Sequence, residues 1–150
     1  MRKAFTMIEL IFVITIIGIL AAVAIPRLAA TRDDAIVSSV ISKTKMMIQE
    51  IVSHSVARGK IDEAHLEESS NTLSFMVGRN EATDDHQGTV KIKMGQINDC
   101  LLLKIIQSGG DVNLTLSYGD PQGDTRCTAL QKRMDIDTYP IPLTGARMRY

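Results

Sequence analysis

The chain has 150 residues, enough for one small domain with an appendage but not for two domains. Its 17 basic and 17 acidic side chains give a formal net charge of zero, which provides no bulk electrostatic attraction for nucleic acid. Tryptophan is absent and aromatic residues make up 4% of the chain, so an aromatic platform for stacking bases is also excluded.

A long apolar stretch begins close to the first residue. Arg2 and Lys3 precede residues 5–25, in which Glu9 is the single charged residue. This stretch is long enough to cross a bilayer core, which takes roughly 20 helical residues. A carboxylate within an apolar helix costs about 2.5–3.5 kcal/mol on insertion scales, so such a group is normally paired and functional. Glu9 is therefore the first candidate functional residue.

A partner for Glu9 would arise if the chain were cut after Ala4. Phe5 would then carry a free α-amino group four residues before Glu9. Residues four apart lie on the same face of a helix. The amine and the carboxylate could therefore pair within one helix, or the amine of one subunit could meet the carboxylate of a neighbour.

These residues carry a family resemblance. Ala4-Phe5-Thr6-Met7-Ile8-Glu9-Leu10, with the apolar run and Ala24-Ile25-Pro26 after it, resembles the class III leader of type IV pilins and type II secretion pseudopilins. The resemblance implies that a prepilin peptidase cuts between Ala4 and Phe5, that Phe5 is then N-methylated, and that Glu9 serves subunit assembly. The resemblance is close only in this N-terminal part of the chain. Ala4 departs from the family, which most often has glycine there, but keeps a small residue.

Two other interpretations of the N-terminus stay open. The basic pair, the apolar region and Ala22-Val23-Ala24 also fit an ordinary secretory signal with an A-x-A cleavage site. The second alternative is a plain membrane anchor. Glu9 lies where the apolar region of a signal should begin, and the uncharged run is long for a signal. The pilin-type leader is therefore the preferred interpretation.

The flanking charges predict an orientation in the membrane. Arg2 and Lys3 directly precede the apolar run, whereas the arginines after it are offset by Asp33 and Asp34. Positive residues stay on the cytoplasmic side. We therefore expect a single-pass protein of the bacterial inner membrane, with its N-terminus in the cytoplasm and its head in the oxidising periplasm.

The helical pattern continues beyond Pro26. Apolar and small residues recur at intervals of three and four, which predicts an amphipathic helix, and Gly59 is a typical stop signal. A helix is thus expected from Phe5 to about Arg58, apolar all round over residues 5–26 and amphipathic over residues 27–58. The predicted buried stripe consists of Ile36, Val37, Val40, Ile41, Thr44, Met47, Ile48, Ile51, Val52 and Ser55.

Gly18 and Pro26 interrupt the apolar half of this helix. In a helix interior, glycine costs about 1 kcal/mol and proline about 3 kcal/mol relative to alanine. The pilin resemblance implies that the corresponding stretch can lose helical structure when subunits enter a filament. Residues 18–26 are accordingly a candidate site of local melting; the alternative is a packing notch at Gly18 and a kink at Pro26.

The remaining residues, 59–150, are predicted to form a small β-rich head. A helix followed by several strands in a row is typical of an α+β fold, here a long N-terminal helix packed on a small antiparallel sheet. Period-two alternation predicts a strand at 89–94, and residues 100–107 and 112–118 read as a hairpin. The other segments are predicted as a short acidic helix or loop (60–70), an apolar element of undefined type (72–77), a polar loop (80–88), a short helix (128–134) and an extended tail (139–143 and 146–150).

Cys100 and Cys127 are the only cysteines. A metal site would need more ligands at closer spacing. Because the head is expected in an oxidising compartment, a disulfide is predicted, and closing this loop would contribute roughly 3–4 kcal/mol in the chain-entropy model. The pair also resembles the disulfide-bounded carboxyl-terminal region of pilins, which commonly carries the exposed, variable surface.

No catalytic constellation emerges from the sequence, and we predict neither an enzyme nor a cofactor. Asp84-Asp85-His86 lies in the predicted polar loop, where a solvated surface is expected. Asp120 and Asp124 offer oxygens that suit Ca²⁺. Some secretion pseudopilins hold calcium, but this run lacks their pattern, so no metal site is predicted.

The resulting prediction is a structural pilin or pseudopilin subunit that polymerises into a filament for type II secretion, a type IV pilus or DNA uptake. Its expected partners are a prepilin peptidase, other pilin-like subunits and the inner membrane, with no direct nucleic-acid partner. The predicted parts are a leader (1–4), a filament-core helix (5–26), an amphipathic helix (27–58) and the head (59–150). The alternatives are a filament-tip receptor for DNA or a surface ligand, and a membrane-anchored periplasmic module that does not assemble.

Overall fold

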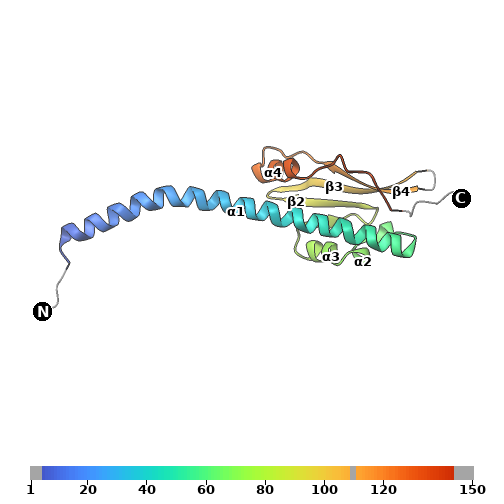
Figure 1. Cartoon of the computed structure of the whole chain (residues 1–150), viewed down its shortest axis with the longest axis horizontal. Helices are drawn as coiled ribbons and strands as arrows, with labels where there is room; N and C mark the ends of the chain where they lie inside the picture. The colour runs from blue at the N-terminus through green and yellow to red at the C-terminus, as the bar shows by residue number, and fades with distance from the viewer. Residues whose placement is uncertain (1–4, 109–110, 144–150) are drawn as a thin grey trace. The chain divides into compact units, whose positions relative to one another are not determined.

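A computed structural model describes residues 5–108 and 111–143 (Figure 1). The predictions for the leader, including Ala4, and for the end of the tail lie outside the described residues. The helices and strands, in chain order, are α1 (Met7–Arg58), η1 (Glu63–His65), α2 (Leu66–Ser69), α3 (Asn71–Gly78), β1 (Ala82–Asp84), β2 (Thr89–Met94), β3 (Ile97–Ser108), β4 (Asp111–Tyr118), α4 (Thr125–Arg133) and β5 (Ile141–Pro142). This long helix with a five-stranded antiparallel sheet is the predicted α+β fold.

The chain divides into two compact units, Met1–Ile36 and Val37–Tyr150. We call the second the globular unit. The boundary falls inside the uninterrupted helix α1, beyond Pro26 and before Gly59. Val37 is the first residue of α1 that is buried, which explains why the second half of the helix groups with the sheet.

The described part of the N-terminal unit is formed mainly by the first part of α1, whose apolar side chains are almost all exposed. The helix is continuous through Gly18 and Pro26. A Cβ placed on Gly18 would meet nothing within 4 Å. Among the described residues, α1 is the helix long and apolar enough to cross a membrane, and none of its most apolar window is buried within the protein.

The second half of α1 forms one wall of the globular unit. Its buried residues repeat at helical spacing, as the predicted stripe requires, because they face the sheet and the short helices. The helix ends at Arg58, and Gly59 follows with a positive φ of 66°, a conformation that favours glycine. The buried residues are Val37, Val40, Thr44, Met47, Ile48, Ile51 and Ser55.

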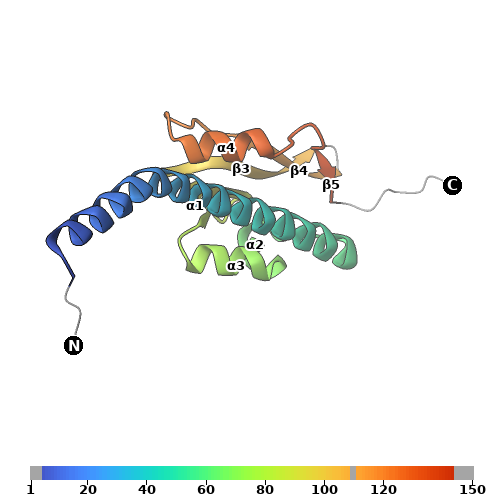
Figure 2. The same cartoon turned by 60° about the vertical axis from the view of Figure 1, so that its left-hand side comes forward.

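The sheet has the strand order β1-β2-β3-β4-β5, with every neighbouring pair antiparallel. Leu103 lies opposite Val90 on one side and Leu116 on the other, and all three are buried. In Figures 1 and 2, the second half of α1 and α4 lie on opposite faces of the sheet, and α2 and α3 lie on the far side of this half of α1 from the sheet. The layers of the globular unit are therefore, in order, α4, the sheet, the second half of α1, and α2 with α3.

The prediction of a polar loop at residues 80–88 is wrong for part of this segment. It contains strand β1, whose Ala82 and Asp84 are buried and pair with Ile92 and Val90 of β2. Asp84 is only 8% exposed, so the expectation of a solvated Asp84-Asp85-His86 run is wrong for Asp84. Three residues are too short a run to show a periodic pattern, and the pairing with β2 decides their conformation.

The remaining elements follow the predicted segments. The apolar element of undefined type is α3, whose first turn is capped by the Ser70 hydroxyl accepting from the Leu73 N–H at 3.0 Å. The hairpin is β3 with β4, and the short helix before the tail is α4. Leu114 and Leu116 of β4 are buried, whereas Tyr118 at the end of the strand is 41% exposed.

Candidate assembly site

The N-terminus of α1 brings Thr6 and Glu9 together. The Glu9 carboxylate accepts hydrogen bonds from the backbone N–H of Thr6 at 2.7 Å and from its hydroxyl at 2.8 Å. The N–H of Glu9 donates to the Thr6 hydroxyl oxygen at 3.4 Å. This reciprocal pattern is a capping box, which satisfies backbone donors that the first turn of a helix otherwise leaves free.

The capping box is a feature that the sequence analysis missed. Its signal, a threonine followed three residues later by a glutamate, is present in Thr6-Met7-Ile8-Glu9. Within a single chain, then, the Glu9 carboxylate already has hydrogen-bond donors.

Phe5 and the apolar residues that follow are open to other molecules. Phe5 is 84% exposed, and the apolar residues of α1 up to Leu28 are also mainly exposed. An apolar helix exposed on all sides is not stable in water on its own and is typical of a helix that meets lipid or other helices. Glu9 is the one acidic residue in this exposed surface before Asp33.

A disulfide joins Cys100 of β3 to Cys127 of α4, with Cα atoms 5.7 Å apart. Both residues are completely buried. The Gln131 side-chain amide, one turn further along α4, donates to the carbonyl oxygens of Cys100 and Gly119, each at 2.9 Å. The covalent bond and this amide hold α4 on the sheet face opposite α1.

Asp124, whose oxygens the sequence analysis considered for Ca²⁺, is the N-cap of α4. Its carboxylate accepts from the N–H groups of Cys127 and Arg126, each at 2.9 Å. The hydrogen bond from Cys127, with that from Arg126, holds the pKa of Asp124 below its usual value despite partial burial. Asp120 instead accepts from the N–H of Gln122 at 2.9 Å. Both aspartates therefore serve the local backbone.

Metal ligands do not gather in the part of the chain that the structure describes. Within residues 5–108 and 111–143, no three His, Cys, Asp or Glu side chains are placed so that they could hold a metal ion.

Two polar contacts in the globular unit could not be read from the sequence. Glu81, beside β1, pairs with Lys43 of α1 at 2.5 Å and with Arg79 at 3.0 Å. Glu50 of α1 accepts from Ser70 and Thr72 at the start of α3. The Lys43–Glu81 pair and the hydrogen bonds of Glu50 join residues far apart in the sequence, so both attach a later segment to α1.

Comparison with known proteins supports the N-terminal interpretation. The family described as "Prokaryotic N-terminal methylation motif" matches residues 1–25. Type IV major fimbrial protein FimA of Dichelobacter nodosus is 37% identical over 92 residues, which cover 59% of this chain and 58% of that protein. The chain thus carries a prokaryotic N-terminal methylation motif and is similar to a type IV fimbrial protein over part of its length. No solved structure gave a significant match.

The comparisons confirm the predicted resemblance to type IV pilins. The N-terminal apolar helix and the leader motif fit an inner-membrane anchor that carries a globular unit. The aligned region spans less than two thirds of the fimbrial relative.

Proposed function

We propose that this pilin-like protein is a filament subunit that is cut between Ala4 and Phe5 by a prepilin peptidase and N-methylated on Phe5. The observation that carries the proposal is one carboxylate, Glu9, at the start of an exposed apolar helix within the methylation motif. Such a helix needs either lipid or other helices around it. Before assembly it sits in the inner membrane with the globular unit in the periplasm, and after assembly it lies in the filament core.

In the proposed mechanism, subunits assemble through the pairing of opposite charges. The new Phe5 amine is a cation next to the motif, and the Glu9 carboxylate of a neighbouring subunit is its partner. Their attraction is strong in an apolar environment because little solvent screens it. The capping box with Thr6 keeps the carboxylate oriented at the helix terminus before the neighbour arrives. The filament acts as a fibre or piston in secretion, in a type IV pilus or in DNA uptake.

Three variants separate charge pairing from helix capping. Glu9→Gln keeps the capping hydrogen bonds but removes the charge, Glu9→Leu removes both, and Thr6→Ala removes the hydroxyl but keeps the charge. We expect both Glu9 variants to be inserted and cut, yet to assemble at least tenfold less filament in a sedimentation assay. Thr6→Ala should assemble nearly as well as the wild type. If Glu9→Gln assembled normally while Thr6→Ala did not, capping and not pairing would be the role of Glu9.

A further inference from the structure

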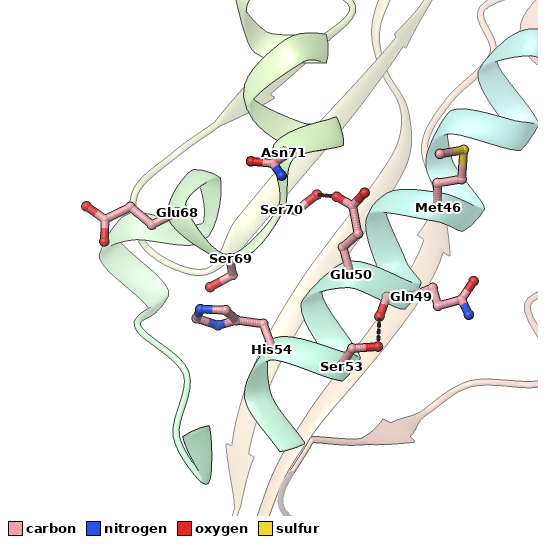
Figure 3. Close-up of a pocket in the computed structure, with 9 residues that line it drawn as sticks. All are labelled: Met46, Gln49, Glu50, Ser53, His54, Glu68, Ser69, Ser70 and Asn71. Carbon is pink, nitrogen blue, oxygen red and sulfur yellow. Dashed lines mark hydrogen bonds between the residues drawn. The ribbon is translucent and has the colours of Figure 1, made fainter. Parts of the chain in front are cut away.

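The charged residues of α1 include two groups with different surroundings. In the globular unit, Lys43 and Glu50 bind later segments of the same chain; Figure 3 shows the hydrogen bond between Glu50 and Ser70. In the N-terminal unit, the charged residues that follow the apolar run are all exposed. They are Arg27, Arg32, Asp33 and Asp34. This second group is the first charged surface that a neighbouring helix would meet beyond the apolar run.

Arg27 and Asp34 lie on the same face of α1 as Glu9. Arg27 follows Glu9 by 18 residues, which is about five complete turns at 3.6 residues per turn. Asp34 follows Arg27 by seven residues, or about two turns, and residues at this spacing share a helix face. Because α1 is one continuous helix, the spacing holds along its whole length. A neighbour that contacts Glu9 therefore also passes Arg27 and Asp34.

The pairing of Phe5 with Glu9 also sets the axial alignment of two neighbouring helices. Subunits of a filament are related by one fixed translation, so a single contact between parallel helices aligns all their residues. If the Phe5 amine of one subunit meets Glu9 of its neighbour, the first subunit is shifted by about four residues, or about 6 Å. Its Arg27 is then level with Thr31 of the neighbour. The neighbour's Asp34 lies about 4.5 Å further along, within reach of a long arginine side chain.

The chemistry of the two side chains suits a contact between subunits. Asp34 already takes part in an interaction within its own chain. An ionised carboxylate has about four acceptor positions, so it can accept from a guanidinium as well. An exposed ion pair contributes little in water, but the attraction grows when neighbouring helices exclude water from around it.

We propose that Arg27 of one subunit pairs with Asp34 of the neighbour whose Glu9 binds its Phe5 amine. The two ion pairs lie at opposite ends of the apolar run on one continuous helix, so a slip along the axis weakens both together. Together they fix the register of the helices. This pairing rests on the proposed filament function and adds a second contact between the same two subunits.

Charge reversal tests the pairing in cells that assemble the full-length chain. Arg27→Glu and Asp34→Lys should each lower the amount of sedimented filament at least fivefold, because each brings like charges together. The double variant Arg27→Glu/Asp34→Lys restores opposite charges and should recover at least half of the wild-type amount. No recovery in the double variant would overturn the proposal.

Arg32 provides the matched control for these variants. It is also exposed and lies five residues after Arg27, but its position is about 140° around the helix from Glu9. Arg32→Glu should therefore assemble as well as the wild type. Membrane levels and removal of residues 1–4 are measured for every variant, which separates a defect in insertion from a defect in assembly. A loss in Arg32→Glu as large as that in Arg27→Glu would contradict the assigned contact.

Photocrosslinking locates the contact while Arg27 and Asp34 stay in place. Ala30, which the shift of about four residues brings level with the neighbour's Asp34, is replaced by p-benzoylphenylalanine. Ala29 is the control, because it lies on nearly the opposite side of the helix from Glu9. Crosslinked dimers from filaments are digested with trypsin and analysed by mass spectrometry. We expect the Ala30 probe to join the neighbour's peptide 33–43, which contains Asp34, at least fivefold more than the Ala29 probe does. Equal yields from the two probes, or crosslinks mainly to other peptides, would overturn the proposal.

Failure of the pairing and failure of the proposed function give different results. A wild-type chain that is inserted and cut but forms no filament would contradict the proposed function, and the pairing with it. Filaments that form equally well in the wild type, Arg27→Glu and Asp34→Lys would leave the filament function intact and exclude the pairing alone.

Discussion

The Glu50 carboxylate accepts hydrogen bonds from both the backbone N–H and the hydroxyl of Thr72, at 3.0 and 2.9 Å. The Ser70 hydroxyl donates a third at 2.6 Å. Since Glu50 is on α1 and Thr72 is in the first turn of α3, the carboxylate fixes α3 against α1. Partial burial raises the pKa of Glu50, but the hydrogen bonds from Ser70 and Thr72 outweigh burial and leave the pKa below its ordinary value of 4.5.

Replacing Glu50 with glutamine should therefore destabilise the protein in a pH-dependent way. A lowered pKa in the folded state stabilises the fold above the unfolded pKa, and this contribution is lost as the pH falls through the folded pKa. At pH 7 we expect Glu50→Gln to lower the free energy of unfolding by about 1–3 kcal/mol. The difference should shrink well below pH 4.5. Chemical denaturation of the full chain in detergent at pH 7 and pH 3 measures both values. Glu67→Gln serves as control, and a pH-independent difference would rule out this role for the charge.

Removing the disulfide should destabilise the globular unit. Cys100 and Cys127 are 27 residues apart, and closing such a loop contributes about 3–4 kcal/mol in the chain-entropy model. The double variant Cys100→Ser/Cys127→Ser should lose about this much unfolding free energy, while membrane insertion through α1 stays unchanged. Non-reducing mass analysis of envelope material should show a chain two hydrogens lighter than the reduced form. Free thiols in freshly isolated material would contradict the prediction.

Gly119 should tolerate no side chain. A Cβ at this position would collide with the backbone carbonyl oxygen of Asp99, so the ends of β3 and β4 would have to separate. Overpacking of this kind typically costs about 1–3 kcal/mol, which is the expected loss of unfolding free energy in Gly119→Ala. Gly78→Ala is the control, since a Cβ there meets nothing within 4 Å. Similar denaturation midpoints for the two variants would show that the close approach is not significant.

The N-terminus of the mature protein should be Phe5. Intact-mass measurement and N-terminal sequencing of envelope protein should detect a chain that lacks residues 1–4 and carries one methyl group on the Phe5 amine. The methylation motif supports this expectation. A chain that starts at Ile25 would instead indicate an ordinary secretory signal cut after Ala22-Val23-Ala24, and the proposed function would fail with it.

Patterns that are local in the sequence predicted most of the architecture. The buried positions of α1 follow a helical repeat that runs from Val37 to Ser55, and strand β2 alternates with period two. The leader motif is likewise a contiguous run, so Phe5 and Glu9 could be singled out without a structure. These features are readable because each depends on the spacing of neighbouring residues along one element.

The tertiary structure decided what depends on residues far apart in the chain. Asp84 is buried because β1 pairs with β2, although its own segment reads as a polar loop. Glu50 looks like a solvent-facing helix residue until α3 places Ser70 and Thr72 around it. Long-range packing sets burial and hydrogen-bond partners, and no spacing rule within one element encodes either.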